Sequence, residues 1–265
     1  MNLKKLSIAI LAGFSLSAFA AELKVGGMNG PESDLLVAAQ QVAKDKYGLD
    51  IEIVRFDDYV TPNIALADGS IDLNAFQHRP YLERMVKDRG FKLAVVGDTF
   101  VYPIGAYSKK IKKVEELKDG AIIAVPNDPS NEGRTLILLH NKGLITLTDP
   151  KNLEASVLDI KDNPHNYDFK EIEAAQLPRM LDEVDLAFIN SGFAVEAGLT
   201  PAKDAIFSEG KDSPYMNIIV AREEDKDKED IKQFVQAYQS DEVKAAAEKA
   251  FKGAAVAGWG KAESK

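Results

Sequence analysis

Short apolar runs alternate with longer amphipathic stretches along almost the whole chain. Between Pro31 and Gly48, apolar residues recur every three to four positions, which predicts a helix that begins at the proline and ends at the glycine. Residues 121–125 are apolar throughout, as is typical of a strand that is covered on both faces. The alternation of such strands and helices predicts an α/β fold with parallel, doubly wound sheets.

Two series of elements follow from this pattern. The predicted strands are 23–25, 51–54, 71–73, 93–96, 100–107, 121–125, 156–160, 169–173, 186–189 and 216–220, and the predicted helices are 31–47, 61–69, 131–142, 229–238 and 241–251. Stretches near 102–105 and 217–222 are candidate connections between two lobes, each a sheet flanked by helices. We therefore expect one discontinuous lobe, residues 21–103 with 221–265, and a second lobe, residues 104–220, with a ligand cleft between them.

The N-terminal segment has the pattern of a secretory signal peptide. Lys4 and Lys5 precede an uncharged run to Leu16, and the small-residue sequence A-F-A ends at Ala20. The run is shorter than the ~20 apolar residues that a membrane span needs. We expect residues 1–20 to be removed by cleavage between Ala20 and Ala21, and no later segment to span a membrane.

Charge and composition narrow the function classes. Cleavage would remove two positive charges and take the formal net charge from −9 to −11, which argues against nucleic acid and anionic membranes as partners. Cysteine is absent, which excludes disulfides, thiolate metal sites and a lipidated N-terminal cysteine. On this basis we expect a soluble, unlipidated protein in the periplasm.

The sequence has no pattern that specifies a reaction. It contains neither a Gly-rich phosphate loop nor a G-x-S-x-G elbow, and a cysteine nucleophile is impossible. His78, His140 and His165 are too widely spaced to indicate a metal site. We therefore expect no enzyme activity, no cofactor and no bound metal.

Four motifs together resemble one protein family. Residues 74–82 read N-A-F-Q-H-R-P-Y-L, residues 124–134 read A-V-P-N-D-P-S-N-E-G-R, residues 175–179 read A-Q-L-P-R, and residues 213–220 read S-P-Y-M-N-I-I-V. These strings, in this order, are similar to the motifs of methionine-binding proteins of methionine ABC importers, in the NlpA-type lipoprotein family. The resemblance covers about residues 23–259. The chain departs from it at Ala20-Ala21, where most members have a lipobox cysteine.

The resemblance implies a two-lobed, type II-like periplasmic binding protein that captures methionine and delivers it to an ABC importer. Its partners would be the importer's permease and ATPase, and we expect a monomer. Two related ligands stay open as alternatives, D-methionine and a methionine-containing dipeptide. An enzyme on the same scaffold would need a nucleophile or a metal cluster in the cleft, and the sequence indicates neither.

Candidate site residues combine these motifs with the chemistry of an amino-acid ligand. Arg134, in the first turn of the predicted 131–142 helix, suits the ligand carboxylate, because a guanidinium binds a carboxylate bidentately. Asn190 and Asn217, each tied to a predicted strand, fall on family ligand positions and offer amide oxygens to the ammonium. Asn131 is expected only to cap the Arg134 helix.

The thioether of methionine favours an apolar, aromatic pocket, because sulfur packs well at ring edges. Phe76, His78 and Tyr81 closely follow a predicted strand and belong to the first motif, so we expect them to line one wall. Tyr59 resembles the tyrosine of a family D-Y-V motif and is expected to close the pocket. The His78 imidazole could face the sulfur or donate a hydrogen bond, and the sequence leaves both open.

Overall fold

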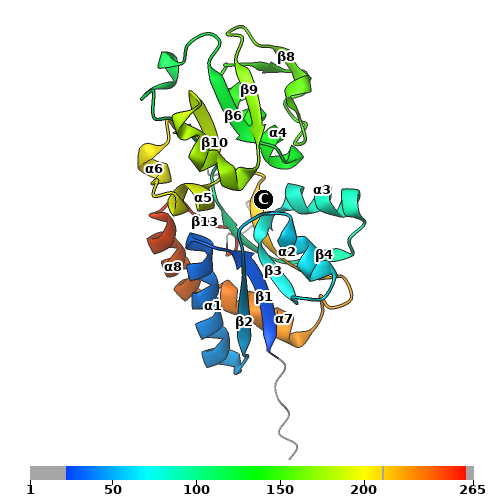
Figure 1. Cartoon of the computed structure of the whole chain (residues 1–265). Helices are drawn as coiled ribbons and strands as arrows, with labels where there is room; N and C mark the ends of the chain where they lie inside the picture. Colours follow the sequence, from blue (N-terminus) through cyan, green and yellow to red (C-terminus); the bar gives the residue numbers. More distant parts are fainter. Residues whose placement is uncertain (1–21, 211, 261–265) are drawn as a thin grey trace, which may run out of the picture.

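The molecule consists of two lobes, one built on a six-stranded sheet and the other on a five-stranded sheet (Figure 1). The computed structural model describes residues 22–210 and 212–260. The predicted signal peptide, residues 1–20, and its cleavage site at Ala20-Ala21 lie outside the described residues. Within the described residues, no helix has the length and apolar character needed to cross a bilayer.

The first lobe has the strand order β13-β4-β12-β3-β1-β2. Its strands are β1 (Leu23–Met28), β2 (Ile51–Phe56), β3 (Leu73–His78), β4 (Leu93–Val101), β12 (Met216–Arg222) and β13 (Val256–Ala257). Its helices are α1 (Pro31–Tyr47), α2 (Thr61–Ala67), α3 (Arg79–Arg89), α7 (Glu229–Tyr238) and α8 (Asp241–Phe251). As the sequence pattern predicts, α1 begins at a proline and ends at Gly48, whose φ of 67° suits glycine.

Both faces of the first sheet are buried. Along β12, Ile219 and Ala221 pack with α1, α7 and α8, whereas Ile218 and Val220 pack with α2 and α3. Successive side chains of a strand point to opposite faces, so a strand covered twice must be apolar throughout. This explains the unbroken apolar run in β12.

The second lobe has the strand order β11-β5-β10-β6-β9. Its strands are β5 (Gly105–Tyr107), β6 (Ile122–Pro126), β9 (Asp168–Ile172), β10 (Leu186–Ile189) and β11 (Phe207–Ser208). Its helices are α4 (Pro129–Asn141), α5 (Ser191–Glu196), α6 (Pro201–Asp204) and the 3-10 helices η1 (Val114–Glu116), η2 (Val157–Asp159) and η3 (Ala174–Asp182). A separate two-stranded sheet joins β7 (Thr146–Leu147) to β8 (Ile160–Asp162).

The sheets are mixed, so the predicted parallel pairing holds for only part of each sheet. β1 runs parallel to β2 and β3, and β6 runs parallel to β9 and β10. β12, however, is antiparallel to both β3 and β4, and β5 is antiparallel to β10. An apolar run indicates burial on both faces but carries no information about strand direction.

The predicted end of the second lobe at residue 220 also needs correction. The predicted boundary puts β12 in the second lobe, yet β12 pairs with β3 and β4 of the first sheet. The chain returns to the first lobe before β12, after β11. We propose that lobe 1 comprises residues 22–101 with 216–260 and lobe 2 residues 105–208, joined by two connections, 102–104 and 209–215.

Two other elements differ from prediction. The predicted strand 100–107 is split between β4 and β5, with Pro103, which has no backbone N–H to donate, in the gap. The predicted strand 156–160 begins as the 3-10 helix η2 and becomes extended only at β8.

The two lobes contact each other across the space between them. An apolar cluster joins Phe76 of lobe 1 to Phe193 of lobe 2, with Tyr59 packed against it. Nearer the surface, Arg84 Nη1 of α3 donates to Glu154 Oε2 of lobe 2 at 3.2 Å. The structure therefore shows the lobes closed on one another.

Candidate functional site

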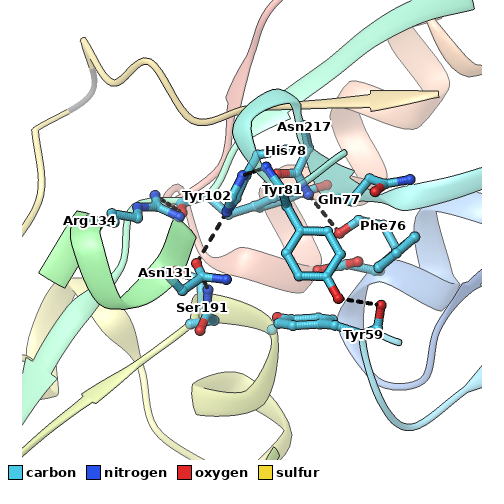
Figure 2. Close-up of a pocket in the computed structure, with 13 residues that line it drawn as sticks. Tyr59, Phe76, Gln77, His78, Tyr81, Tyr102, Asn131, Arg134, Ser191 and Asn217 are labelled. Atoms are coloured by element: carbon cyan, nitrogen blue, oxygen red, sulfur yellow. Dashed lines mark hydrogen bonds between the residues drawn. The ribbon is translucent and has the colours of Figure 1, made fainter. Parts of the chain in front are cut away.

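A pocket lies between the lobes, where loops and strand ends of both sheets meet (Figure 2). Lobe 1 supplies aromatic and polar side chains from α1, the loop before α2, β3, α3 and β12, and lobe 2 supplies mainly polar side chains from α4 and α5. The lining residues are Glu32, Tyr59, Phe76, Gln77, His78, Tyr81, Tyr102, Asn131, Arg134, Asn190, Ser191, Gly192 and Asn217.

One wall of the pocket is aromatic. The Tyr59 ring centroid lies 6.0 Å from that of Phe76, 6.2 Å from that of Tyr81 and 5.0 Å from that of Phe193. The Tyr81 hydroxyl donates to the Tyr59 backbone oxygen at 2.9 Å, which holds the loop before α2 against α3. Such a wall suits an apolar ligand group, and a thioether in particular.

His78 ends β3 and caps α3. Its Nδ1 accepts the Tyr81 backbone N–H at 3.2 Å, so Nδ1 carries no proton in the neutral ring. The proton is on Nε2, which donates to Asn131 Oδ1 at 3.2 Å. Burial, and then the positive charge of Arg134, lower the pKa of His78 to about 3. The histidine is therefore a neutral hydrogen-bond donor that links the lobes, which answers the question that its sequence left open.

A chain of amide contacts determines how Asn190 faces the pocket. Asp128, the N-cap of α4, accepts from Asn131 Nδ2 at 2.9 Å, so Asn131 turns its Oδ1 toward His78 and Asn190. Asn190 Nδ2 donates to that oxygen at 3.0 Å. Asn190 Oδ1 is then left buried without a hydrogen-bond partner. A buried acceptor of this kind costs free energy unless a ligand donor reaches it.

Arg134 is held in place by residues of the two connections between the lobes. Its Nε lies 3.1 Å from Glu209 Oε2, and its Nη2 also bonds to that carboxylate and donates to the Tyr102 backbone oxygen at 3.0 Å. The guanidinium carbon lies 4.5 Å from the Tyr215 ring centroid. Within the described residues, Arg134 Nη1 makes no hydrogen bond, so it can donate to a ligand.

The structure corrects one detail of the Arg134 prediction. α4 begins at Pro129 with Asp128 as its cap, so Arg134 lies in the second turn rather than the first. Asp128 also accepts the Asn131 backbone N–H at 3.0 Å. This cap occupies the helix N-terminus, so Asn131 lines the pocket and does not cap the helix.

Asn217 enters the pocket from β12. Its Nδ2 donates to the Phe76 backbone oxygen at 3.1 Å, across the β3–β12 pairing. That contact directs the amide group and leaves its oxygen as an acceptor. Because β12 belongs to lobe 1, Asn217 and Asn190 approach the pocket from opposite lobes.

Glu32 is the most unexpected residue in the pocket. It lies in the first turn of α1 and is 7% exposed, and burial raises the pKa of its carboxyl to about 8. The carboxyl is thus mostly protonated at neutral pH in the ligand-free molecule.

The structure brings all seven predicted side chains to this one pocket: Tyr59, Phe76, His78, Tyr81, Arg134, Asn190 and Asn217. Their roles toward a ligand stay predictions. Sequence reasoning missed Glu32, Gln77, Tyr102, Ser191 and Gly192, and it assigned Asn131 only an indirect role. Gln77, Ser191 and Gly192 adjoin predicted residues, so their neighbours could have indicated them.

Comparison with known proteins places the chain in a family. A family model described as NlpA lipoprotein matches residues 23–259. The chain belongs to the NlpA lipoprotein family. Among its NlpA relatives is the D-methionine-binding lipoprotein MetQ of Escherichia coli (strain K12), 59% identical over 239 residues that cover 89% of this chain and 88% of MetQ. Outer membrane lipoprotein 3 of Mannheimia haemolytica is 52% identical over 98% of this chain and all of its own length.

Solved structures of NlpA relatives have the same two-lobed fold. The crystal structure of the methionine-binding protein MetQ matches with a TM-score of 0.89 and 58% identity, over 91% of this chain and 99% of that one. A nutrient-binding protein from Burkholderia cenocepacia bound to methionine matches with a TM-score of 0.88 and 49% identity, over 89% of this chain and 100% of that one. The predicted class, a two-lobed α/β binding protein, is confirmed.

The NlpA relatives contradict the predicted location. We expected a freely soluble, unlipidated periplasmic protein after cleavage at Ala20-Ala21, but the relatives are lipoproteins by name. This chain differs from those relatives in having no cysteine to carry a lipid.

Proposed function

We propose that this protein is the substrate-binding component of a methionine ABC importer, and that it binds rather than transforms its ligand. The composition of the pocket carries the proposal: a buried cation, a buried amide oxygen without a partner, and an aromatic wall together match the carboxylate, ammonium and thioether of methionine. The MetQ relatives, which are named for methionine binding, and the methionine-bound structural neighbour support the same ligand.

In the proposed complex, Arg134 Nη1 donates to the ligand carboxylate while Glu209 and Tyr102 hold the guanidinium. Asn190 Oδ1 and the Asn217 oxygen accept from the ammonium. The ligand thus contacts both lobes, and a ligand with contacts on both lobes stabilises the closed arrangement. The closed protein would then dock on the importer's permease, whose partner ATPase drives transport.

The aromatic residues Tyr59, Phe76 and Tyr81 would hold the thioether side chain. His78 would act through Asn131, because its Nε2 proton is used in the contact with Asn131 Oδ1. Its role in this proposal is to fix the amide that orients Asn190, rather than to meet the sulfur.

A related ligand is the second candidate, because several relatives are named for D-methionine. Titration calorimetry with L-methionine, D-methionine and the dipeptide Gly-Met tests both. We expect tight binding of at least one methionine enantiomer. Binding of Gly-Met with no binding of either enantiomer would overturn the assignment, and absence of binding by all three would refute the proposed function itself.

A further inference from the structure

Glu32 has no structural role that explains its burial. Nothing in the described residues forms a hydrogen bond or an ion pair with its carboxyl, although the side chain is 7% exposed and lines the pocket. Glu132, also buried, provides a contrast: it lies outside the pocket lining, and its Oε1 accepts the Val157 backbone N–H at 2.8 Å. Buried carboxyls ordinarily have such partners, and Glu32 has none among the described residues.

The Glu32 carboxyl lies at the Asn190 end of the pocket. A Cβ atom added to Gly192 would lie 3.0 Å from Glu32 Oε1, so the carboxyl of lobe 1 reaches the first turn of α5 in lobe 2. Gly192 is two residues after Asn190, the N-cap of α5. The partnerless Asn190 Oδ1 of lobe 2 and the Glu32 carboxyl of lobe 1, which accepts no hydrogen bond from the described residues, therefore lie at the same end of the pocket.

Together with the Asn217 oxygen assigned above, these two groups would give each of the three N–H donors of an ammonium an acceptor. Resting on the proposed function, we propose that the Glu32 carboxylate binds the amino group of the ligand, next to Asn190 Oδ1. The contact forms a desolvated ion pair, which is stronger than the amide contacts alone. On binding, the carboxylic acid loses its proton to solvent and the resulting carboxylate accepts hydrogen bonds from the ammonium.

The described groups around Glu32 do not supply a positive counter-ion for its carboxylate. Three tyrosines lie near enough for the charge of Glu32 to raise their pKa, namely Tyr59, Tyr102 and Tyr238. In addition, Glu196 of α5 packs against Gly30, and Arg55 of β2 donates to the Ser33 hydroxyl at 2.6 Å.

Each of these groups leaves Glu32 free for a ligand. The tyrosines stay neutral at pH 7, since burial raises the pKa of each above its usual range. Glu196 carries the wrong charge, and no described residue, Arg55 included, forms an ion pair with Glu32. An ammonium from the ligand would be the first cation to meet it.

Proton release measures this contact directly. With a pKa of about 8, Glu32 is roughly 90% protonated at pH 7 before binding. Calorimetry at pH 7 would be repeated in buffers of different ionisation enthalpy, with whichever methionine enantiomer binds. The natural protein should release close to one proton per ligand molecule bound. A methionine analogue with hydrogen in place of the amino group should release none.

Two matched variants assign the proton. Glu32→Gln copies the shape of the protonated acid, so it should fold normally, release no proton and bind methionine about 10- to 100-fold more weakly. Glu132→Gln, which alters the other buried glutamate with a raised pKa, should keep both the affinity and the proton release. Tight binding by the natural protein without proton release, or unchanged affinity of Glu32→Gln, would overturn the proposal and leave the proposed function standing.

Discussion

The pairing of Arg134 with Glu209 determines what removal of Arg134 does to the protein. The Arg134 side chain is 3% exposed and that of Glu209 is 14% exposed, so Arg134→Ala leaves a mostly buried carboxylate without its cation. Ser213 Oγ, which donates to Glu209 at 2.9 Å, would be its remaining partner. Breaking a buried pair in this way costs ~3–5 kcal/mol, and we expect the lower end because Glu209 is partly solvated.

The Tyr102 backbone oxygen adds to that cost, since it loses the Arg134 Nη2 donor at 3.0 Å. An acceptor left without its partner costs about 1 kcal/mol or more. The expected loss of folding stability for Arg134→Ala is therefore about 4 kcal/mol. The loss of ligand affinity predicted for the same variant must be measured on molecules that are still folded.

A double-mutant cycle separates the pair from its surroundings. Arg134→Ala, Glu209→Ala and the double variant would be unfolded in urea without ligand, followed by circular dichroism. We expect a favourable coupling of about 2 kcal/mol between the two side chains. The account of a buried, coupled pair would be refuted if the stability losses of the two single variants summed to that of the double variant within ~0.5 kcal/mol. A loss below ~1 kcal/mol for Arg134→Ala would refute it too.

Two further predictions concern stability. In Gly133→Ala, the new Cβ would lie 2.4 Å from the Leu153 backbone oxygen, so we expect unfolding in urea to show a loss of ~1–3 kcal/mol. Gly210→Ala, whose Cβ would meet none of the described residues within 4 Å, should be nearly neutral, and equal effects of the two substitutions would contradict this. Since the pKa of His78 is about 3 when folded and near 6.5 when unfolded, its neutral form stabilises the fold fully above pH 6.5 and loses that contribution as the pH falls toward 3. As the pH falls from 6.5 to 3, the free energy of unfolding of the natural protein should drop, relative to that of His78→Gln, by up to ~1.4 kcal/mol per pH unit. If the two proteins lose stability in parallel, His78 is not buried as a neutral group.

The elements of this fold are more predictable than their arrangement. The helices at α1, α7 and α8 follow from apolar spacing, capping glycine and proline, all of which act within a few residues. The place of β12 does not, because its apolar run would suit the middle of either sheet. Only pairing with β3 and β4, more than a hundred residues away in sequence, decides it.

The site, too, is only partly predictable from the sequence. The seven predicted side chains were found from motifs and from the chemistry of the ligand, and they share one pocket. Glu32 has no sequence signature, because an acidic residue in the first turn of a helix is ordinarily a solvated partner of the helix dipole. Its burial depends on α5 of the other lobe, which contacts it only in the folded molecule.

The central position of β12 has a consequence for the order in which the chain matures. The strands of lobe 2 are complete once residue 208 has been made, whereas β3 and β4 of lobe 1 wait for residues 216–222 to fill the gap between them. During synthesis lobe 2 can therefore assemble while, in lobe 1, β4 still has no partner strand and β3 has one unpaired edge. Unpaired edges present free N–H and C=O groups to other chains, so nascent lobe 1 stays open to incorrect strand pairing for longer than lobe 2.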